Sequence, residues 1–231
     1  MTGKTVGVLG GMGPDATVDF MASVIALTKA GKDQDHIRMV VDHNPQVPDR
    51  QEAMHGDRTK VSAALREMAL RLENAGADFL VMPCNTAHAF LPDILASIHI
   101  PFLHIVDETV AEVAAVCPPS KMVGILATTA CIEAGIYQAA LNAAGRTSVL
   151  PDQRRQREIM KLIFRIKGGD KGAEVRAAMR DHAMELAKAG AAIVIAGCTE
   201  IPLVVSEADL DVPLVSSTDV LARRTVAFAT E

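Results

Sequence analysis

The sequence lacks the features that mark membrane, secreted and nucleic-acid-binding proteins. No apolar run approaches the ~20 residues that a membrane helix needs. The opening run VGVLGG at 6–11 is too short and too rich in glycine for the core of a signal peptide. The net charge is -5 and the pI is near 5.8, so no basic excess favours nucleic acid or an acidic membrane surface. We therefore expect a cytoplasmic protein with neither a nucleic-acid nor a membrane partner.

Motifs for metals and nucleotides are also missing. None of the four cysteines forms a C-x-x-C pair or a cysteine and histidine cluster with zinc spacing, so no metal site is expected. The glycines at 10–13 lack the G-x-G-x-x-G spacing of a dinucleotide-binding turn. In a reducing compartment the thiols stay free. They are therefore either reactive or inert: Cys84, Cys117, Cys131 and Cys198.

Apolar runs of strand length alternate with amphipathic helical patterns. Strands are predicted at 4–9, 78–82, 122–126 and 191–195, because these runs lack the alternation of a half-exposed strand. Helices are predicted at 59–75 and 175–189, which end at Gly76 and Gly190 as C-terminal caps. This order predicts an α/β fold with mainly parallel sheets flanked by helices.

An internal repeat divides the chain. VGVLGG at 6–11 matches VGILAT at 123–128, AGADFLVMPCNT at 75–86 matches AGAAIVIAGCTE at 189–200, and IPFL at 100–103 matches VPLV at 212–215. The nearly constant spacing predicts two similar α/β domains related by pseudo-two-fold symmetry. We expect residues 1–100 with 212–231 to form the first domain and residues 101–211 the second.

The repeat places Cys84 and Cys198 at equivalent strand ends. Ligands bind outside the carboxyl ends of parallel strands, so two facing domains would present these thiols from opposite walls of one cleft. Racemisation needs that geometry, because a proton leaves one face of the α-carbon and another arrives at the opposite face. A helix start capped by Asn85 or Thr86 would also lower the pKa of Cys84.

The alternative for any single cysteine is a small buried packing residue. We assign Cys117 and Cys131 to this role because neither has a partner in the repeat. His88 lies four residues after Cys84, where it could bond near the thiol or serve the fold alone. His43 and His104 are taken as structural.

Six motifs carry a resemblance to a known family. They are LGGMGP at 9–14, NPQVPDR at 44–50, PCNTAH at 83–88, IPFLHI at 100–105, LATT at 126–129 and GCTEIP at 197–202. Together they resemble the aspartate/glutamate racemase superfamily, and specifically its aspartate racemase branch. The resemblance implies a homodimer of two-domain α/β subunits. It also implies racemisation of a small acidic amino acid, most directly L-aspartate to D-aspartate, by two cysteines without pyridoxal phosphate or any other cofactor.

The resemblance also assigns residues. Cys84 and Cys198 would donate and accept the proton, and eight further residues would bind substrate: Met12, Arg50, Asn85, Thr86, Thr128, Lys167, Thr199 and Glu200. Arg50 and Lys167 would meet carboxylates, and arginine can grip a carboxylate with two hydrogen bonds. The chain departs from the family pattern at Ala130 and Cys131. It also lacks the Asp-Ser-Gly opening typical of glutamate racemases, which favours aspartate.

Three alternatives remain open. The chain could racemise both aspartate and glutamate, or it could be a decarboxylase or cis-trans isomerase of the same superfamily that uses one cysteine. A catalytically silent amino-acid-binding protein is the third alternative, although such a protein would have no need to keep both thiols. The sequence leaves open which cysteine deprotonates which enantiomer and where the domains meet.

Overall fold

The computed structural model describes residues 3–231 and separates into two compact units. Unit 1 runs to Ile105 and includes Thr218–Glu231, and unit 2 is Val106–Ser217. The chain therefore passes from one unit to the other twice, a few residues after each boundary expected from the sequence. Within the described residues, no helix is long and apolar enough to cross a membrane.

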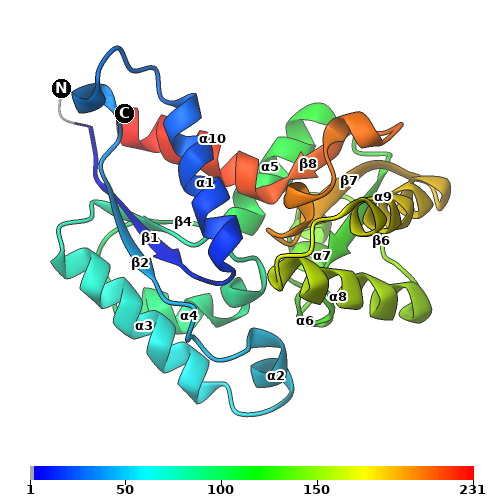
Figure 1. Ribbon diagram of the computed structural model, residues 1–231, viewed down its shortest axis with the longest axis horizontal. Helices are drawn as coiled ribbons and strands as arrows, with labels where there is room; N and C mark the ends of the chain where they lie inside the picture. The colour runs from blue at the N-terminus through cyan, green and yellow to red at the C-terminus, as the bar shows by residue number, and fades with distance from the viewer. Residues whose placement is uncertain (1–2) are drawn as a thin grey trace. The chain divides into compact units, whose positions relative to one another are not determined.

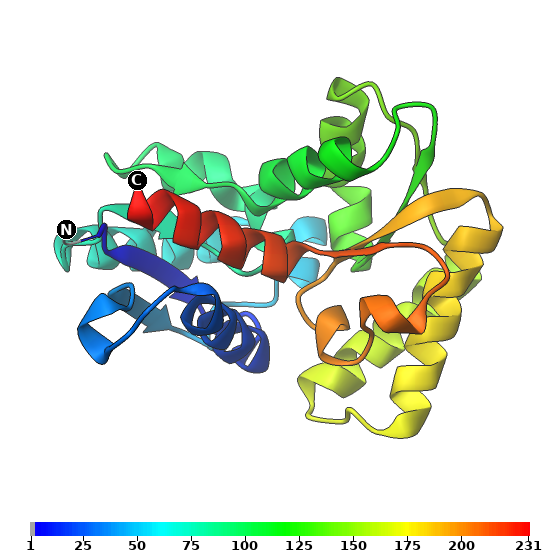
Figure 2. The same cartoon turned by 90° about the horizontal axis from the view of Figure 1, so that it is seen from above.

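Unit 1 is built on a parallel four-stranded sheet. Its strand order is β2-β1-β3-β4, formed by Met39–His43, Val6–Gly10, Phe79–Val81 and Phe102–Leu103. Helices α1 (Pro14–Leu27) and α10 (Ser217–Thr230) cover one face of this sheet (Figures 1 and 2). Helix α3 (Thr59–Asn74) packs on the other face, next to α4 (Leu91–Leu95). The short helix α2 (Arg50–His55) precedes α3.

Unit 2 repeats this plan. Its parallel sheet has the order β6-β5-β7-β8, formed by Ser148–Val149, Met122–Ala127, Ala191–Gly197 and Leu214–Ser216. Helix α9 (Ala173–Lys188) packs on β5 and β7, and α8 (Gln153–Lys167) packs against α9. This unit also contains the α-helices α5 (Ile105–Val116), α6 (Thr129–Glu133) and α7 (Ile136–Ala143).

The fold class and the internal repeat predicted from the sequence are confirmed. The two sheets have the same order and direction when β1 is matched to β5, and each matching segment of the repeat occupies the same strand in both. The long helices also end as expected, since Gly76 and Gly190 adopt positive φ values of 87° and 101°. The helix-to-strand turns are therefore local features that the glycines specify.

The central strands β3 and β7 direct alternate side chains toward their helices. In unit 1, Leu80, Met82 and Cys84 belong to one apolar cluster with side chains of α3. In unit 2, Val194, Ala196 and Cys198 belong to a cluster with side chains of α8 and α9. Each cysteine, just past the end of its strand, therefore belongs to the same cluster as the helix-facing side chains of that strand.

Candidate active site

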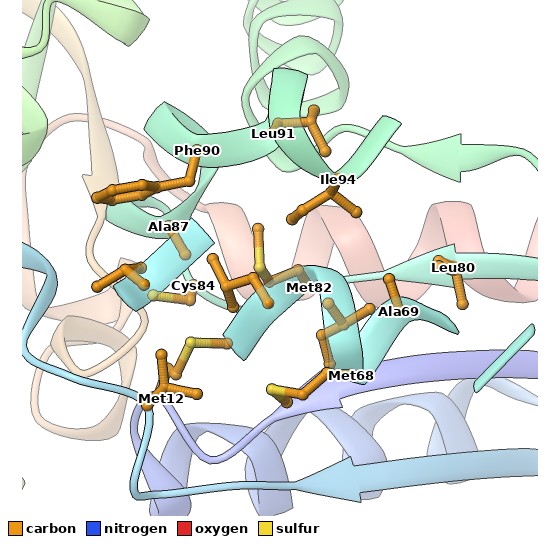
Figure 3. Close-up of a cluster of buried hydrophobic side chains, with 14 of the residues drawn as sticks. Met12, Met68, Ala69, Leu80, Met82, Cys84, Ala87, Phe90, Leu91 and Ile94 are labelled. Carbon is orange, nitrogen blue, oxygen red and sulfur yellow. The ribbon is translucent and has the colours of Figure 1, made fainter. Parts of the chain in front are cut away.

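Cys84 lies at the carboxyl edge of the unit 1 sheet. Its side chain is buried in the apolar cluster, and its N–H donates to the Met82 carbonyl at 2.8 Å, which makes a tight turn after β3. Figure 3 shows Cys84 at the same end of the cluster as Met12 and Ala87. The predicted substrate-binding residue Met12 therefore lies in the same cluster as the predicted catalytic thiol.

The loop that carries Met12 depends on Gly11. Gly11 has a φ of 91°, and a Cβ on it would lie 2.4 Å from the backbone carbonyl carbon of Asn44. The loop is held by the Gly11 N–H, which donates to Thr17 Oγ1 at 2.8 Å, and by the Asn44 N–H, which donates to the Gly10 carbonyl at 3.2 Å. The loops after β1 and β2 thus touch backbone to backbone, which only glycine permits here.

Arg50 is the first residue of α2, and the Asp49 carboxylate caps this helix by accepting from two backbone N–H groups. The Arg50 guanidinium turns back on its own loop, where Nη1 donates to the Val47 carbonyl at 2.9 Å and the Pro48 carbonyl at 3.0 Å. Val47 belongs to the cluster that contains Met12 and Cys84. Arg50 is therefore fixed to a loop that borders the candidate site.

The segment after Cys84 differs from the expected capped α-helix. Asn85 and Thr86 are buried, but the Asn85 side chain makes no capping bond, and Thr86–Phe90 forms a 3₁₀-helix. The Leu91 N–H bonds to the His88 carbonyl in the 3₁₀ pattern, and Pro92 then has no N–H with which to continue a regular helix. The expected helix start is therefore present at Thr86, but it is of the 3₁₀ type and lacks the side-chain cap of Asn85.

Cys198 occupies the matching edge of the unit 2 sheet, where its buried thiol meets polar side chains. Its Sγ donates to Glu200 Oε2 at 3.0 Å, and the Thr199 hydroxyl lies 3.4 Å from the same oxygen. The Lys167 ammonium, at the end of α8, forms an ion pair with Glu200 Oε1. The Glu200 side chain is only 3% exposed. The thiol, the hydroxyl and the ammonium are thus polar partners of a buried carboxylate, and burial of an unpartnered carboxylate would be costly.

This environment sets the charge of the Cys198 thiol. Burial raises the pKa of Cys198 well above its ordinary value, the Glu200 carboxylate raises it further, and Lys167 opposes both effects. Only the three-residue 3₁₀-helix Ile201–Leu203 follows, with Pro202 inside it. Cys198 is therefore a protonated thiol near neutral pH, which suits it to deliver a proton.

Thr128 follows β5 at the same edge. Its Oγ1 accepts from the Cys131 N–H at 3.2 Å and caps α6. Because Ala127 pairs with Gly197 in the sheet, Thr128 and Cys198 follow neighbouring residues of adjacent strands. Ala130 and Cys131, where the chain departs from the family pattern, are buried in α6.

His88 bonds to main chain rather than to the Cys84 thiol. Nδ1 lies 2.9 Å from the Cys84 carbonyl oxygen, and the Ile105 N–H donates to Nε2 at 3.3 Å. Burial, followed by the neighbouring His104, lowers the pKa of His88 to about 3. Tyr137, the single tyrosine, was not singled out from the sequence, although it is fully buried beside Gly197, one residue before Cys198.

The candidate residues thus form one group in each unit. Met12, Cys84, Asn85 and Thr86 lie at the carboxyl edge of one sheet, with Arg50 on the bordering loop, and Thr128, Cys198, Thr199 and Glu200 lie at that edge of the other, with Lys167 paired to Glu200. All four cysteines are free thiols. Across residues 3–231, no group of three histidine, cysteine or acidic side chains could hold a metal ion. Each group contains one thiol and one cation.

Comparison with known proteins gives a consistent family. A sequence profile described as Asp/Glu/Hydantoin racemase matches residues 9–225. The chain is 31% identical over 228 residues to a broad specificity amino-acid racemase, RacX, of Bacillus subtilis, and the match covers 96% of each chain.

Solved structures agree with this result. An aspartate racemase of Picrophilus torridus superposes with a TM-score of 0.82 at 30% identity, covering 97% of this chain and 95% of the other. A glutamate racemase isoform of Bacillus anthracis gives a TM-score of 0.72 over 100% of this chain and 85% of the other, but at 19% identity this likeness concerns the fold alone.

Proposed function

Because the chain belongs to the Asp/Glu/hydantoin racemase family, we propose that it racemises an acidic amino acid, most directly aspartate, with Cys84 and Cys198 as the two acid/base groups. Family membership makes the protein an isomerase that acts on amino acids. The identity of the substrate, the two-thiol mechanism, the homodimer and the cytoplasmic location are the proposal.

The equivalence of the two cysteines carries this proposal. Each follows an inner strand of a sheet with the same strand order, and each shares a buried cluster with the helix-facing side chains of that strand. Two thiols related in this way can act on opposite faces of one α-carbon when both units bind a single substrate. A decarboxylase or isomerase with one catalytic cysteine would need only one of the two positions.

The reaction then needs one thiolate and one thiol. In one direction the Cys84 thiolate takes the α-proton, and the electron pair of the C–H bond remains on the substrate as a carbanion delocalised into the α-carboxylate. Cys198 delivers its proton to the opposite face. The reverse reaction begins with Cys198 as thiolate and Cys84 as thiol. The raised pKa of Cys198 supports its starting as the proton donor.

The contacts of the remaining candidate residues suggest what each would do in this reaction. Arg50 is the best candidate for the side-chain carboxylate of aspartate, because its guanidinium is fixed to a loop that borders Cys84. Glu200 is better placed as the partner of the Cys198 thiol than as a ligand of an anionic substrate, which its carboxylate would repel. Lys167 offsets the charge of Glu200. Asn85, Thr86, Thr128 and Thr199 remain candidates for the α-carboxylate and amine, and Met12 for backbone contacts.

Racemisation in heavy water tests the proposal. We expect the wild type to convert L-aspartate into D-aspartate that carries deuterium at the α-carbon, as followed by optical rotation and NMR. Replacement of either thiol, by Cys84→Ser or by Cys198→Ser, should lower kcat at least a thousandfold, because each removes one of the two proton-transfer groups. The matched control is Cys117→Ser, a buried cysteine outside both groups, which should stay within about twofold of wild type.

The same assay distinguishes the alternatives. A panel of aspartate, glutamate and neutral amino acids separates an aspartate racemase from a broad-specificity enzyme. Failure to invert either aspartate or glutamate would overturn the acidic substrate, and racemisation at the wild-type rate by the single cysteine variants would overturn the two-thiol mechanism. Size-exclusion chromatography tests the homodimer, and cell fractionation tests the location.

A further inference from the structure

His88 connects the peptide of Cys84 to a distant segment of unit 1. The ring is 3% exposed, and both nitrogens bond to main-chain groups. Nε2 accepts from the Ile105 N–H, so in the neutral ring Nδ1 carries the proton and donates it to the Cys84 carbonyl. The pKa of about 3 agrees with a neutral ring. Ile105 is the last residue before the chain leaves unit 1.

Tyr137 makes an equivalent connection in unit 2. Its hydroxyl hydrogen-bonds to Thr109 and Ser217, and the Ser217 hydroxyl donates to the Ala196 carbonyl at 2.9 Å. Tyr137 Cε2 would lie 3.0 Å from a Cβ on Gly197, so the ring packs directly against the strand end before Cys198. Thr109 lies just after the first passage between the units, and Ser217 just before the second.

Both buried rings therefore have the same kind of partners, namely the backbone beside a cysteine and the segments where the chain passes between units. We propose that His88 and Tyr137 are positioning residues that hold Cys84 and Cys198 in register with these crossover segments. The inference rests on the proposed two-thiol function. Its physical basis is that proton transfer depends steeply on the placement of the reacting atoms, so that a shift of about 1 Å can cost about a hundredfold in rate.

Neither ring takes or gives a proton in this scheme. The His88 nitrogens are both occupied by main-chain groups, and burial raises the pKa of Tyr137 far above neutral pH, so its hydroxyl keeps its proton. Their effect is exerted through the backbone that carries each thiol. Loss of one ring's hydrogen bonds should therefore slow the proton transfer of its own cysteine more than that of the other.

Three substitutions test this inference. His88→Asn places an amide donor where Nδ1 lies and keeps the bond to the Cys84 carbonyl, whereas His88→Gln places its amide nearer Nε2 and loses that bond. Tyr137→Phe removes one hydroxyl and keeps the ring. We expect kcat to fall about tenfold to a hundredfold in His88→Gln and Tyr137→Phe, with less loss in His88→Asn and little change in KM.

Isotope effects provide the readout that a loss of stability alone would not change. Primary isotope effects on kcat/KM are measured with α-deuterated L- and D-aspartate. When one thiol's transfer is slowed, the isotope effect rises for the enantiomer that this thiol deprotonates and falls for the other. His88→Gln and Tyr137→Phe should therefore shift the two isotope effects in opposite senses.

The outcomes separate this inference from the proposed function. Equal shifts, or wild-type isotope effects with a lower melting temperature alone, would reduce both rings to structural residues and overturn the inference. An inactive wild type, or active cysteine-to-serine variants, would instead overturn the two-thiol function. If the His88 variants fail to fold, Tyr137→Phe decides the question by itself, because a wild-type ratio of its isotope effects contradicts the proposal.

Discussion

At the residue scale, the environment of Cys198 shows how a buried site sets the charge of a thiol. The sulfur donates to Glu200, and Glu200 is in turn paired with Lys167. Burial and the carboxylate both favour the protonated thiol, and the ammonium favours the thiolate. The balance therefore depends on two side chains of opposite charge, whose separate removal should have opposite effects.

We predict that Glu200→Gln lowers the pKa of Cys198 and that Lys167→Met raises it. The sign follows because Gln removes a negative charge that destabilises the thiolate, whereas Met removes a positive charge that stabilises it. The pH dependence of alkylation by iodoacetamide, followed by mass spectrometry on the peptide that contains Cys198, measures the shift.

The matched control is Lys188→Met, which removes an exposed lysine paired with Glu185 elsewhere in unit 2. It should leave the alkylation midpoint unchanged. An upward shift in Glu200→Gln, or shifts of the same sign in both test variants, would mean that Coulombic interaction with Glu200 and Lys167 does not govern this thiol.

At the element scale, the candidate residues of a sheet lie close together because short loops hold these residues at the ends of the strands. The loop after β1 turns at Gly11 against the backbone of Asn44, and the next residue, Met12, enters the cluster around Cys84. A side chain at position 11 would meet backbone, which cannot move aside as a flexible side chain can. The geometry of this loop should thus be coupled to both stability and activity.

Replacement of Gly11 by alanine should cost at least about 3 kcal/mol of unfolding free energy, since it combines an unfavourable φ with a backbone clash. It should also lower kcat/KM more than tenfold. The control Gly135→Ala has a positive φ of 66° but meets no atom within 4 Å, so it should cost only about 1 kcal/mol. Urea unfolding measures the loss of unfolding free energy in the two variants. Equal losses in Gly11→Ala and Gly135→Ala would show that the contact with Asn44 contributes nothing.

At the scale of the whole molecule, the chain forms two parallel sheets with equivalent strand order, and each sheet has its own apolar cluster. The two candidate groups lie in different units, and each contains only one thiol and one cation. If one thiol acts on each face of the α-carbon, the substrate must contact both groups. The two cations of these groups also match the two carboxylates of an acidic amino acid. Binding should therefore be detected in both units at once.

We expect L-aspartate to slow amide hydrogen exchange in peptides covering 82–90 and 196–204 together. Cys84→Ser protein is used so that the ligand is not turned over, and L-arginine serves as a control of opposite side-chain charge. Hydrogen exchange with mass spectrometry measures the effect. Protection of one peptide without the other would contradict a single substrate held by both units.

The fold was predictable from the sequence because its signals are local and repeated. Continuous apolar runs identified the central strands, Gly76 and Gly190 marked the ends of long helices, and the repeat anticipated that the two sheets would match. The helix start after Cys84 was predicted, but its 3₁₀ type and the missing Asn85 cap were not, and His88 in this segment is held by tertiary hydrogen bonds. Residue preference at a single helix start carries no such information.

The sequence by itself determined the family, the duplicated α/β plan and the equivalence of Cys84 and Cys198, because each is written in the order of residues along the chain. Only the tertiary structure decided that Glu200 meets both the Cys198 thiol and Lys167, and that His88 and Tyr137 bond to the crossover segments. These contacts join residues that lie far apart in the chain, with the exception of the neighbours Cys198 and Glu200. They depend on side-chain direction and burial, which no spacing in the sequence specifies.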